Sequence, residues 1–184
     1  MIINGVTIDD TFAEAFGMRG IRLLITACNE TWAMHSAVAL TGFATSVIAC
    51  GAEAGIERLL SPDETPDGRP GVSVLLFAVS SKELIKQVER RVGQCVLTSP
   101  TSAIFAGLDE GDPVPMGKTL RYFGDGFQTS KQIAGKRYWR IPVMDGEFLC
   151  EENTRVVKAI GGGNFLILAR DQASALAASE RAVV

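Results

Sequence analysis

The sequence has a single histidine, His35, and its four cysteines are far apart in the chain. Metal sites need several ligands at characteristic spacings, so the sequence predicts no metal site. Lysine and arginine form no long run and the net charge is −3, which argues against a nucleic-acid partner. No apolar stretch approaches the roughly 18 residues of a membrane-spanning helix. The first residues lack the basic and apolar segments of a signal peptide, so we expect a cytoplasmic location.

The 184 residues are 47% hydrophobic and 21% charged, as in ordinary globular proteins. This length is sufficient for one well-buried domain with further structure attached. Free cysteine behaves as a small hydrophobic residue, and most of the cysteines here lie in or beside apolar segments. We therefore interpret them as buried, reduced thiols. They are Cys28, Cys50, Cys95 and Cys150.

Residues 19–97 show the order strand, helix, strand, strand, helix, strand. Apolar β-branched runs indicate the strands, and apolar positions three and four residues apart indicate the helices. The expected strands are Gly20–Cys28, Thr45–Cys50, Val72–Val79 and Cys95–Leu97, and the expected helices are Thr31–Leu40 and Lys82–Val92. This order is typical of the ferredoxin-like split βαβ arrangement, an α+β sandwich with both helices on one face of the sheet.

Short elements are expected on both sides of this core. Asn4-Gly5 predicts a β-hairpin at the start of the chain. A capping box of Thr11 and Glu14, beside Asp10, predicts the start of a short helix. After the fourth strand, we expect a turn that leads into a short helix over Thr98–Gly107, a loop over Asp109–Pro115, and an added β region with strands at Thr119–Phe123, Arg137–Met144 and Glu147–Cys150.

The end of the sequence repeats the opening pattern. Ala159–Ala169 predicts a glycine turn that feeds an apolar strand, and Gln172–Val183 predicts a helix. One strand and one helix cannot build a sheet alone. Either this strand joins the first sheet, or the chain is the front part of a longer, internally duplicated protein, and we expect the second. Residues 1–150 then form a complete lobe, and residues 151–184 form an incomplete second copy.

Two carboxylates stand in turns of small residues. Glu53 follows the expected second strand, and Asp125 lies in a Gly-Asp-Gly turn. Each is a candidate catalytic acid or base, because a partly buried carboxylate can transfer a proton near neutral pH. The alternatives are structural: a helix start or an ion pair for Glu53, and a turn cap for Asp125.

Two loops carry candidate substrate-binding residues. In the first, Pro66-Asp67-Gly68 predicts a tight turn, and the adjacent Arg69 can bind a carboxylate or phosphate, with a solvated arginine as the alternative. The second loop is rich in hydroxyl groups and follows the expected fourth strand. If it opens a helix, its free N–H groups favour negative charge. The candidates are Asp67, Arg69, Gln94, Thr98, Ser99, Thr101 and Ser102.

Seven long blocks of the sequence resemble formylmethanofuran:tetrahydromethanopterin formyltransferases. They extend over nearly the whole chain, and none is a short motif that arises often by chance. They are Asn4–Phe16, Thr41–Glu57, Glu64–Ser73, Gly93–Phe105, Arg121–Gln128, Trp139–Phe148 and Gly161–Ala169. Several of them are similar to the bacterial branch, in which the transferase is a subunit of a complex with a hydrolase.

The resemblance implies two ferredoxin-like lobes, with residues 1–150 as the proximal lobe and residues 151–184 as the start of the distal lobe. It implies formyl transfer between the amine of methanofuran and N5 of tetrahydromethanopterin by direct amide exchange. Both coenzymes are then co-substrates, and no prosthetic group is expected. Expected partners are further copies of the chain, as a dimer or tetramer, and hydrolase subunits. Family members continue past the position of residue 184, so we expect the isolated chain to lack part of the catalytic machinery.

Two other functions fit part of these observations. A non-catalytic lobe would assemble or dock the subunits of a formyltransferase/hydrolase complex and leave the chemistry to its partners. A ferredoxin-like small-molecule sensor would fit the fold but not the matching blocks.

Overall fold

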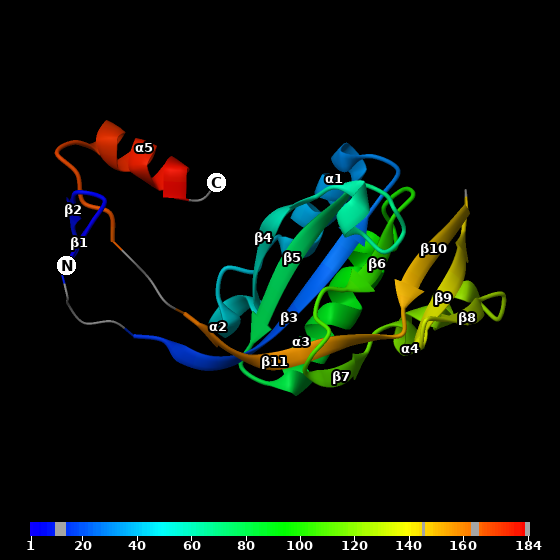
Figure 1. Ribbon diagram of the computed structural model, residues 1–184. Helices are drawn as coiled ribbons and strands as arrows, with labels where there is room; N and C mark the ends of the chain where they lie inside the picture. The colour runs from blue at the N-terminus through cyan, green and yellow to red at the C-terminus, as the bar shows by residue number, and fades with distance from the viewer. Residues whose placement is uncertain (10–13, 145, 163–165, 183–184) are drawn as a thin grey trace. The chain divides into compact units, whose positions relative to one another are not determined.

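The computed structural model describes residues 1–9, 14–144, 146–162 and 166–182. They form two compact units. The larger unit is Gly17–Gly161, and the smaller unit combines Met1–Phe16 with Gly162–Val184. Most of the helices and strands belong to the larger unit, which is of mixed α+β class (Figure 1).

A large mixed sheet forms the framework of the larger unit (Figure 1). Four of its strands are β3 (Phe16–Thr26), β4 (Glu53–Leu60), β5 (Gly71–Ala78) and β6 (Ala103–Ala106). They follow the order β4-β5-β3-β6, and each neighbouring pair is antiparallel. The strands expected over residues 20–28 and 72–79 are therefore confirmed as β3 and β5, with shifted ends.

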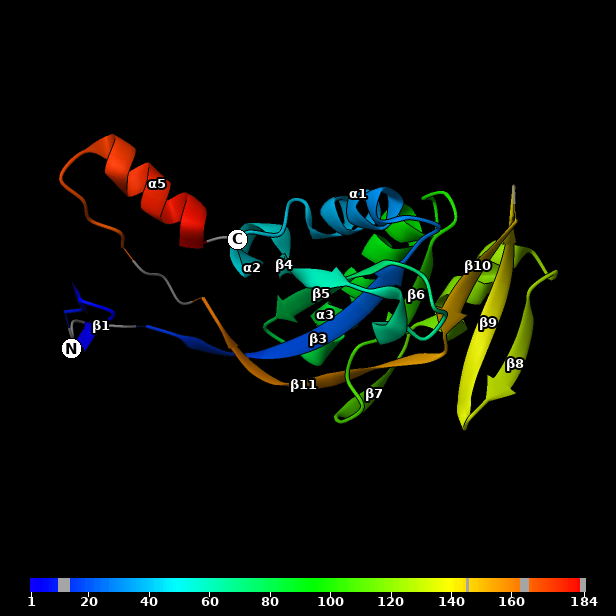
Figure 2. The same ribbon diagram turned by 45° about the horizontal axis from the view of Figure 1, so that its top comes forward.

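Two helices cover one face of these strands. They are α1 (Glu30–Thr41) and α3 (Ser81–Arg91), and both confirm helices expected from the sequence. Alternate residues of β3 and β5 face them, because successive side chains of a strand point to opposite sides. The resulting buried core contains Ile21, Leu23, Ile25, Val72, Val74, Leu76, Ala33, Ala37, Leu40, Leu84 and Val88. Figure 2 shows α1 lying beside the strands.

The ends of α1 are satisfied by groups from outside the helix. The Asn29 side chain accepts a hydrogen bond from the Trp32 N–H at the helix start. The last turn of α1 holds no basic residue that could bind the free carbonyl groups at the helix end. Arg91 of α3 binds them instead. Its guanidinium donates to the carbonyls of Leu40, Gly42 and Phe43 at 2.7–3.1 Å.

The strand expected at Thr45–Cys50 is wrong. This segment contains the short helix α2 (Val47–Cys50), and the second strand begins later, at Glu53. The Ser46 side chain accepts a hydrogen bond from the Ile48 N–H and so starts the helix. Gly51, with a φ of 75°, ends it in the left-handed conformation that glycine adopts without strain.

The strand expected at Cys95–Leu97 is also wrong, as is the short helix expected after it. Residues Val92–Val96 continue α3 as a π-helical turn, η2, in which the Leu97 N–H donates to the Val92 carbonyl. The fourth strand is β6, within the segment where a helix was expected. Apolar runs this short have no periodicity that separates a strand from a helix.

The added β region is partly confirmed. Strands β9 (Lys136–Val143) and β10 (Gly146–Glu151) lie where expected. β9 pairs with β10 on one side and with β8 (Thr129–Ile133) on the other. β10 runs parallel to β6 and so joins this region to the core sheet.

The strand expected at Thr119–Phe123 is wrong, because these residues belong to the short helix α4 (Gly117–Leu120) and the 3₁₀ turn η3 (Arg121–Gly124). The Arg121 guanidinium lies 5.0 Å from the ring centres of both Tyr122 and Trp139, which holds the turn against β9.

The strand β11 (Asn153–Gly161) was not expected from the sequence, which predicted a strand only within Ala159–Ala169. It pairs with β3 and with β7 (Asp112–Pro115), a strand inside the segment expected to be a loop. The strand expected within Ala159–Ala169 is wrong for residues 166–169, which are irregular, and residues 163–165 lie outside the described residues.

The smaller unit contains the expected hairpin and terminal helix. Strands β1 (Ile2–Ile3) and β2 (Val6–Thr7) pair across Asn4 and Gly5, whose φ angles of 51° and 78° are those of a tight hairpin turn. Helix α5 (Gln172–Ala182) confirms the expected C-terminal helix. The capping box proposed for residues 10–14 lies largely outside the described residues. None of the helices in the described ranges is long and apolar enough to cross a membrane.

Candidate substrate-binding site at one end of the sheet

Three loops meet where β3 ends. Thr26, the last residue of β3, is fully buried and pairs with Gly71 of β5 and Ala103 of β6. Because β5 and β6 are antiparallel to β3, the loops that precede them end beside Thr26. These are residues 61–70, which include the 3₁₀ turn η1 (Pro62–Glu64), and residues 97–102. The loop from β3 to α1 completes the group.

A hydrogen-bonded cluster joins these loops. The Thr26 hydroxyl donates to Asp67 Oδ2 at 2.7 Å and accepts from Arg69 Nη2 at 3.0 Å. Arg69 Nε also donates to Asp67 Oδ2, at 2.8 Å. Charged partners strengthen such bonds and fix the plane of the guanidinium. We call Thr26, Asp67, Arg69 and Thr101 the Thr26 cluster.

Thr101 joins the cluster through its backbone and its side chain. Arg69 Nη1 donates to the Thr101 carbonyl at 2.6 Å, and the Cys28 N–H donates to the Thr101 hydroxyl at 3.1 Å. Thr101 has a φ of 62°, which β-branched residues rarely adopt. The structure thus brings together Asp67, Arg69 and Thr101, which come from the two loops that the sequence indicated.

The remaining candidates belong to the same loop as Thr101 or, for Gln94, to η2 before it. The Thr98 hydroxyl donates to the Gln94 carbonyl, and the buried Ser102 hydroxyl donates to the carbonyls of Val96 and Ser99. These bonds fold the loop tightly onto the end of η2. The Gln94 side chain is exposed on η2.

Two pockets open at this end of the larger unit. One, of about 250 Å³, has the hydroxyl-rich loop as one wall and the ends of β9 and β10 as the other. The second, of about 480 Å³, is mostly apolar and includes a few charged residues in its lining, a composition common in ligand sites. It is lined by Pro66, Asp67, Phe105, Thr129, Ser130, Lys131, Ile133, Tyr138, Arg140 and Leu149.

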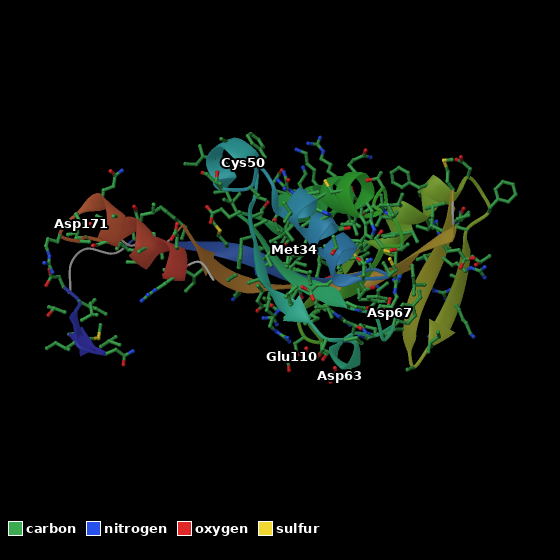
Figure 3. The ribbon with its side chains drawn as sticks, turned by 90° about the horizontal axis from the view of Figure 1, so that it is seen from above. Met34, Cys50, Asp63, Asp67, Glu110 and Asp171 are labelled. Carbon is green, nitrogen blue, oxygen red and sulfur yellow. The ribbon has the colours of Figure 1, made fainter. Side chains whose placement is uncertain are left out.

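The two candidate catalytic carboxylates are not part of this site. Glu53 begins β4 and Asp67 follows its end, so the eight-residue strand, which extends over roughly 23 Å from its first to its last residue, lies between them. Figure 3 shows Cys50, which lies just before β4, well apart from Asp67. Asp125 is exposed, with a φ of 47°, in the turn after η3 and lines none of the pockets above.

Several residues of the site were missed by sequence reasoning. Thr26 carries the cluster, yet a threonine within an apolar strand has no distinguishing pattern. Tyr138 and Lys131 line the larger pocket from β9 and β8, which the sequence indicated only as an added β region. Burial and the nearby Glu151 carboxylate raise the pKa of the Tyr138 hydroxyl, so it remains a neutral donor.

The interpretation of the cysteines is correct only in part. Cys150 is fully buried, and burial raises the pKa of its thiol well above the ordinary value. Cys50 and Cys95 are half-buried, and Cys28 is exposed beside the Thr26 cluster. Among the residues that the structure describes, no three histidine, cysteine or carboxylate side chains are placed to hold a metal ion.

Comparison with known proteins places the chain in a family. The sequence model described as formylmethanofuran-tetrahydromethanopterin formyltransferase matches residues 1–143. A second family model, described as the proximal lobe of this formyltransferase, matches residues 146–184. The family model therefore gives the name proximal lobe to residues 146–184, whereas the sequence resemblance led us to expect it for residues 1–150.

Individual relatives match over the whole chain. The formylmethanofuran–tetrahydromethanopterin formyltransferase of Methylococcus capsulatus is 72% identical over 183 residues, which cover 100% of this chain and 61% of the relative. A formyltransferase/hydrolase complex subunit from Methylorubrum extorquens is 53% identical, over 98% of this chain and 60% of the relative.

Solved structures agree with these matches. The formyltransferase from Methanosarcina barkeri has a TM-score of 0.94 at 52% identity, covering 100% of this chain and 62% of that chain. The formyltransferase/hydrolase complex from Methylorubrum extorquens in complex with methylofuran has a TM-score of 0.92 at 52% identity, covering 98% and 60%. The chain thus spans about three fifths of the length of these relatives. It belongs to the formylmethanofuran-tetrahydromethanopterin formyltransferase family.

Proposed function

We propose that this chain is part of an enzyme that transfers a formyl group between methanofuran and N5 of tetrahydromethanopterin. The observation that carries the proposal is the 72% identity to a formyltransferase over the full chain. The two coenzymes act as co-substrates, and the reaction needs no bound prosthetic group. In it, the amine nitrogen of one coenzyme attacks the formyl carbon carried by the other. The new C–N bond forms, the old one breaks, and one proton moves from the attacking nitrogen to the leaving nitrogen.

The end of the sheet that contains the Thr26 cluster supports this chemistry. Direct exchange requires both coenzymes in contact and donors near the oxygen that becomes negative in the tetrahedral intermediate. We propose that Gln94, Thr98, Ser99, Thr101 and Ser102 form the surface that meets the formyl-bearing group, with Asp67 and Arg69 beside them. Glu53 and Asp125 stay proposals for proton transfer. Glu53 lies at the opposite end of β4 from the loop that carries Asp67, and Asp125 lines neither pocket.

We further propose that the larger unit is ferredoxin-like in detail. The strand order β4-β5-β3-β6 supports this, together with α1 after β3 and α3 after β5. The division into residues 1–150 and 151–184 also stays a proposal. The change of compact unit at residue 162 supports a second lobe in this region, whereas β11 pairs within the larger unit.

The assembly we propose is a homo-oligomer that also binds hydrolase subunits. Support comes from the Methylorubrum extorquens relative, which is named as a subunit of such a complex. Leu166, Leu168 and Leu176 expose 59–92% of their surface, which is apolar area available for contacts. The four free cysteines support a reducing compartment such as the cytoplasm.

A chimera tests the proposed activity. This chain replaces the matching region of the Methylococcus capsulatus relative, and the product is assayed for formyl transfer between the two coenzymes by mass spectrometry. We expect turnover comparable to that of the unaltered relative. A folded chimera that forms the hydrolase complex without transferring formyl groups would support the docking function instead and contradict the proposed activity.

A further inference from the structure

We propose that Arg69 is a positioning residue: it holds the backbone of Thr101 in the left-handed conformation and thereby fixes the hydroxyl-rich loop, residues 98–102, as the wall of the pocket. This role rests on the proposed function, since the pocket matters only if a substrate enters it. It differs from the role expected from the sequence, in which Arg69 binds an anionic coenzyme tail directly.

Thr101 cannot keep its conformation unaided. At a φ of 62°, the Cβ atom of an L-residue crowds the backbone, and the second branch of threonine makes this worse. Asparagine and glycine adopt this region more readily than threonine does. Residues held in such conformations persist only where the surrounding structure fixes them, and they occur often at functional sites.

Two groups fix Thr101 from opposite sides. Arg69 Nη1 holds its carbonyl oxygen, and the Cys28 N–H holds its hydroxyl. The carbonyl contact is the shorter of the two, 2.6 Å against 3.1 Å, and it is charge-assisted. Arg69 is therefore the stronger of the two restraints on the strained residue.

Arg69 is itself held in place before any ligand arrives. Its Nε and Nη2 atoms are bonded to Asp67 and Thr26, and its side chain is only 32% exposed. Three of its N–H groups thus point into the protein. An arginine that waits for a ligand would keep this fork directed at solvent or at the pocket, so the geometry favours a role through Thr101.

The loop that Arg69 controls forms one wall of the 250 Å³ pocket. Residues 97–102 line this pocket in an unbroken run. If Thr101 relaxed to an ordinary φ, the chain direction would change in the middle of that wall. Thr98 and Ser99, which precede Thr101 in that wall, would then shift, although no residue that lines the pocket had been replaced.

The test compares Arg69→Ala with Arg58→Ala in this chain. Arg58 is a matched control, because it also lies near the β4–β5 connection and is ion-paired, to Glu64 at 2.7 Å, without touching Thr101. Amide exchange followed by NMR reports the Cys28 N–H, which loses its acceptor when Thr101 moves. We expect exchange about tenfold faster in R69A and unchanged in R58A. Equal protection of the Cys28 amide in R69A and the parent chain would overturn the proposal.

The formyl-transfer activity of the chimera described above provides a second, independent test of the role of Arg69. We expect R69A to lower kcat at least about tenfold with KM for both coenzymes within about twofold, because a misplaced wall affects orientation rather than binding. Thr101→Gly in the R69A background should restore most of kcat, since glycine adopts a positive φ without help. A raised KM that T101G does not rescue would mean that Arg69 binds a coenzyme directly. If the parent chimera is inactive, the proposed function fails while the exchange experiment still decides this inference.

Discussion

The carboxylate of Glu57 binds the guanidinium of Arg22 across an intervening strand. Arg22 of β3 donates from Nε at 2.8 Å and from Nη2 at 2.5 Å, and Ser73 of β5, which lies between them, donates at 2.6 Å. Glu57 reaches this position because the register of β4 shifts between Ile56 and Arg58. The three side chains tie together β4, β5 and β3 on the face opposite the helices.

This contact predicts a pH dependence of stability. The hydrogen bonds from Arg22, and then from Ser73, lower the pKa of Glu57 below its ordinary 4.5. A lowered carboxyl pKa stabilises the fold above the unfolded-state value, and the contribution disappears as the pH falls through the folded-state value. We expect Glu57→Gln to cost about 0.5–1 kcal/mol at pH 7, because the pair is partly exposed, and progressively less below pH 4.5.

Urea unfolding at a series of pH values measures this difference. Glu110→Gln is the control, since Glu110 is exposed. A Glu57→Gln penalty that stays constant from neutral to acidic pH would show that the carboxylate charge contributes nothing.

Phe43 is a strained residue whose replacement should stabilise the protein. It has a φ of 50° and a side chain that is 79% exposed, so a bulky residue occupies a glycine-like conformation without burying its ring. Phe43→Gly should raise the free energy of unfolding by about 0.5–1 kcal/mol. Phe127→Gly is the matched control, because Phe127 is 80% exposed and its φ is not positive. If both variants lose stability equally in chemical denaturation, the positive φ of Phe43 does not destabilise the protein.

Gly117 is required by close packing. A Cβ atom there would lie 2.5 Å from Trp139 Cδ1 and 3.0 Å from the Glu151 carbonyl oxygen, so backbone and ring would both have to move. We expect Gly117→Ala to lower the free energy of unfolding by about 1–3 kcal/mol. Gly55→Ala, where no atom lies within 4 Å of the added Cβ, should be neutral or nearly so. Thermal unfolding of the two variants checks the contrast, and an equal midpoint would refute the packing argument.

The cysteines should separate into reactive and protected thiols. Cys28 is exposed, and a hydrogen bond that the Cys50 sulfur accepts from the backbone at Ser46 lowers the pKa of Cys50. Burial raises the pKa of Cys150 well above its ordinary value. Brief alkylation of the native chain at about pH 7.5, below the ordinary thiol pKa, followed by peptide mass spectrometry, should label Cys28 and Cys50 and leave Cys150 unmodified until the chain is unfolded. Early labelling of Cys150 would contradict its placement in the core.

The long elements were predictable because their patterns are strong. The apolar, β-branched run over residues 20–28 indicates a strand without ambiguity. The helix after Ser80 combines apolar positions on one face with a serine cap at its start. The errors fall on short segments. Residues 45–50 are apolar enough for a strand, yet the Ser46 cap and Gly51 turn them into a helix.

The sequence could predict several residues of the candidate site, but not how they are arranged in space. The two loops were chosen for the chemistry of Arg69 and of the hydroxyl groups, and both lie at one end of the sheet. What the sequence did not reveal is that Thr26, a strand residue, connects them. The pairing of the strands decides which loops lie side by side. Because the second and fourth strands were placed wrongly, the sequence could not predict which loops meet at Thr26.

The π-helical turn η2 has a consequence for insertions and deletions. Each residue of an ordinary helix rotates the chain by about 100°, and η2 contains one residue more than an ordinary turn. If the same five residues wound as an ordinary helix, the downstream chain would be rotated by about that angle. The direction in which the hydroxyl-rich loop leaves the helix therefore depends on the wider winding of η2, which accommodates the extra residue. Substitutions in η2 should be tolerated better than a change in its length.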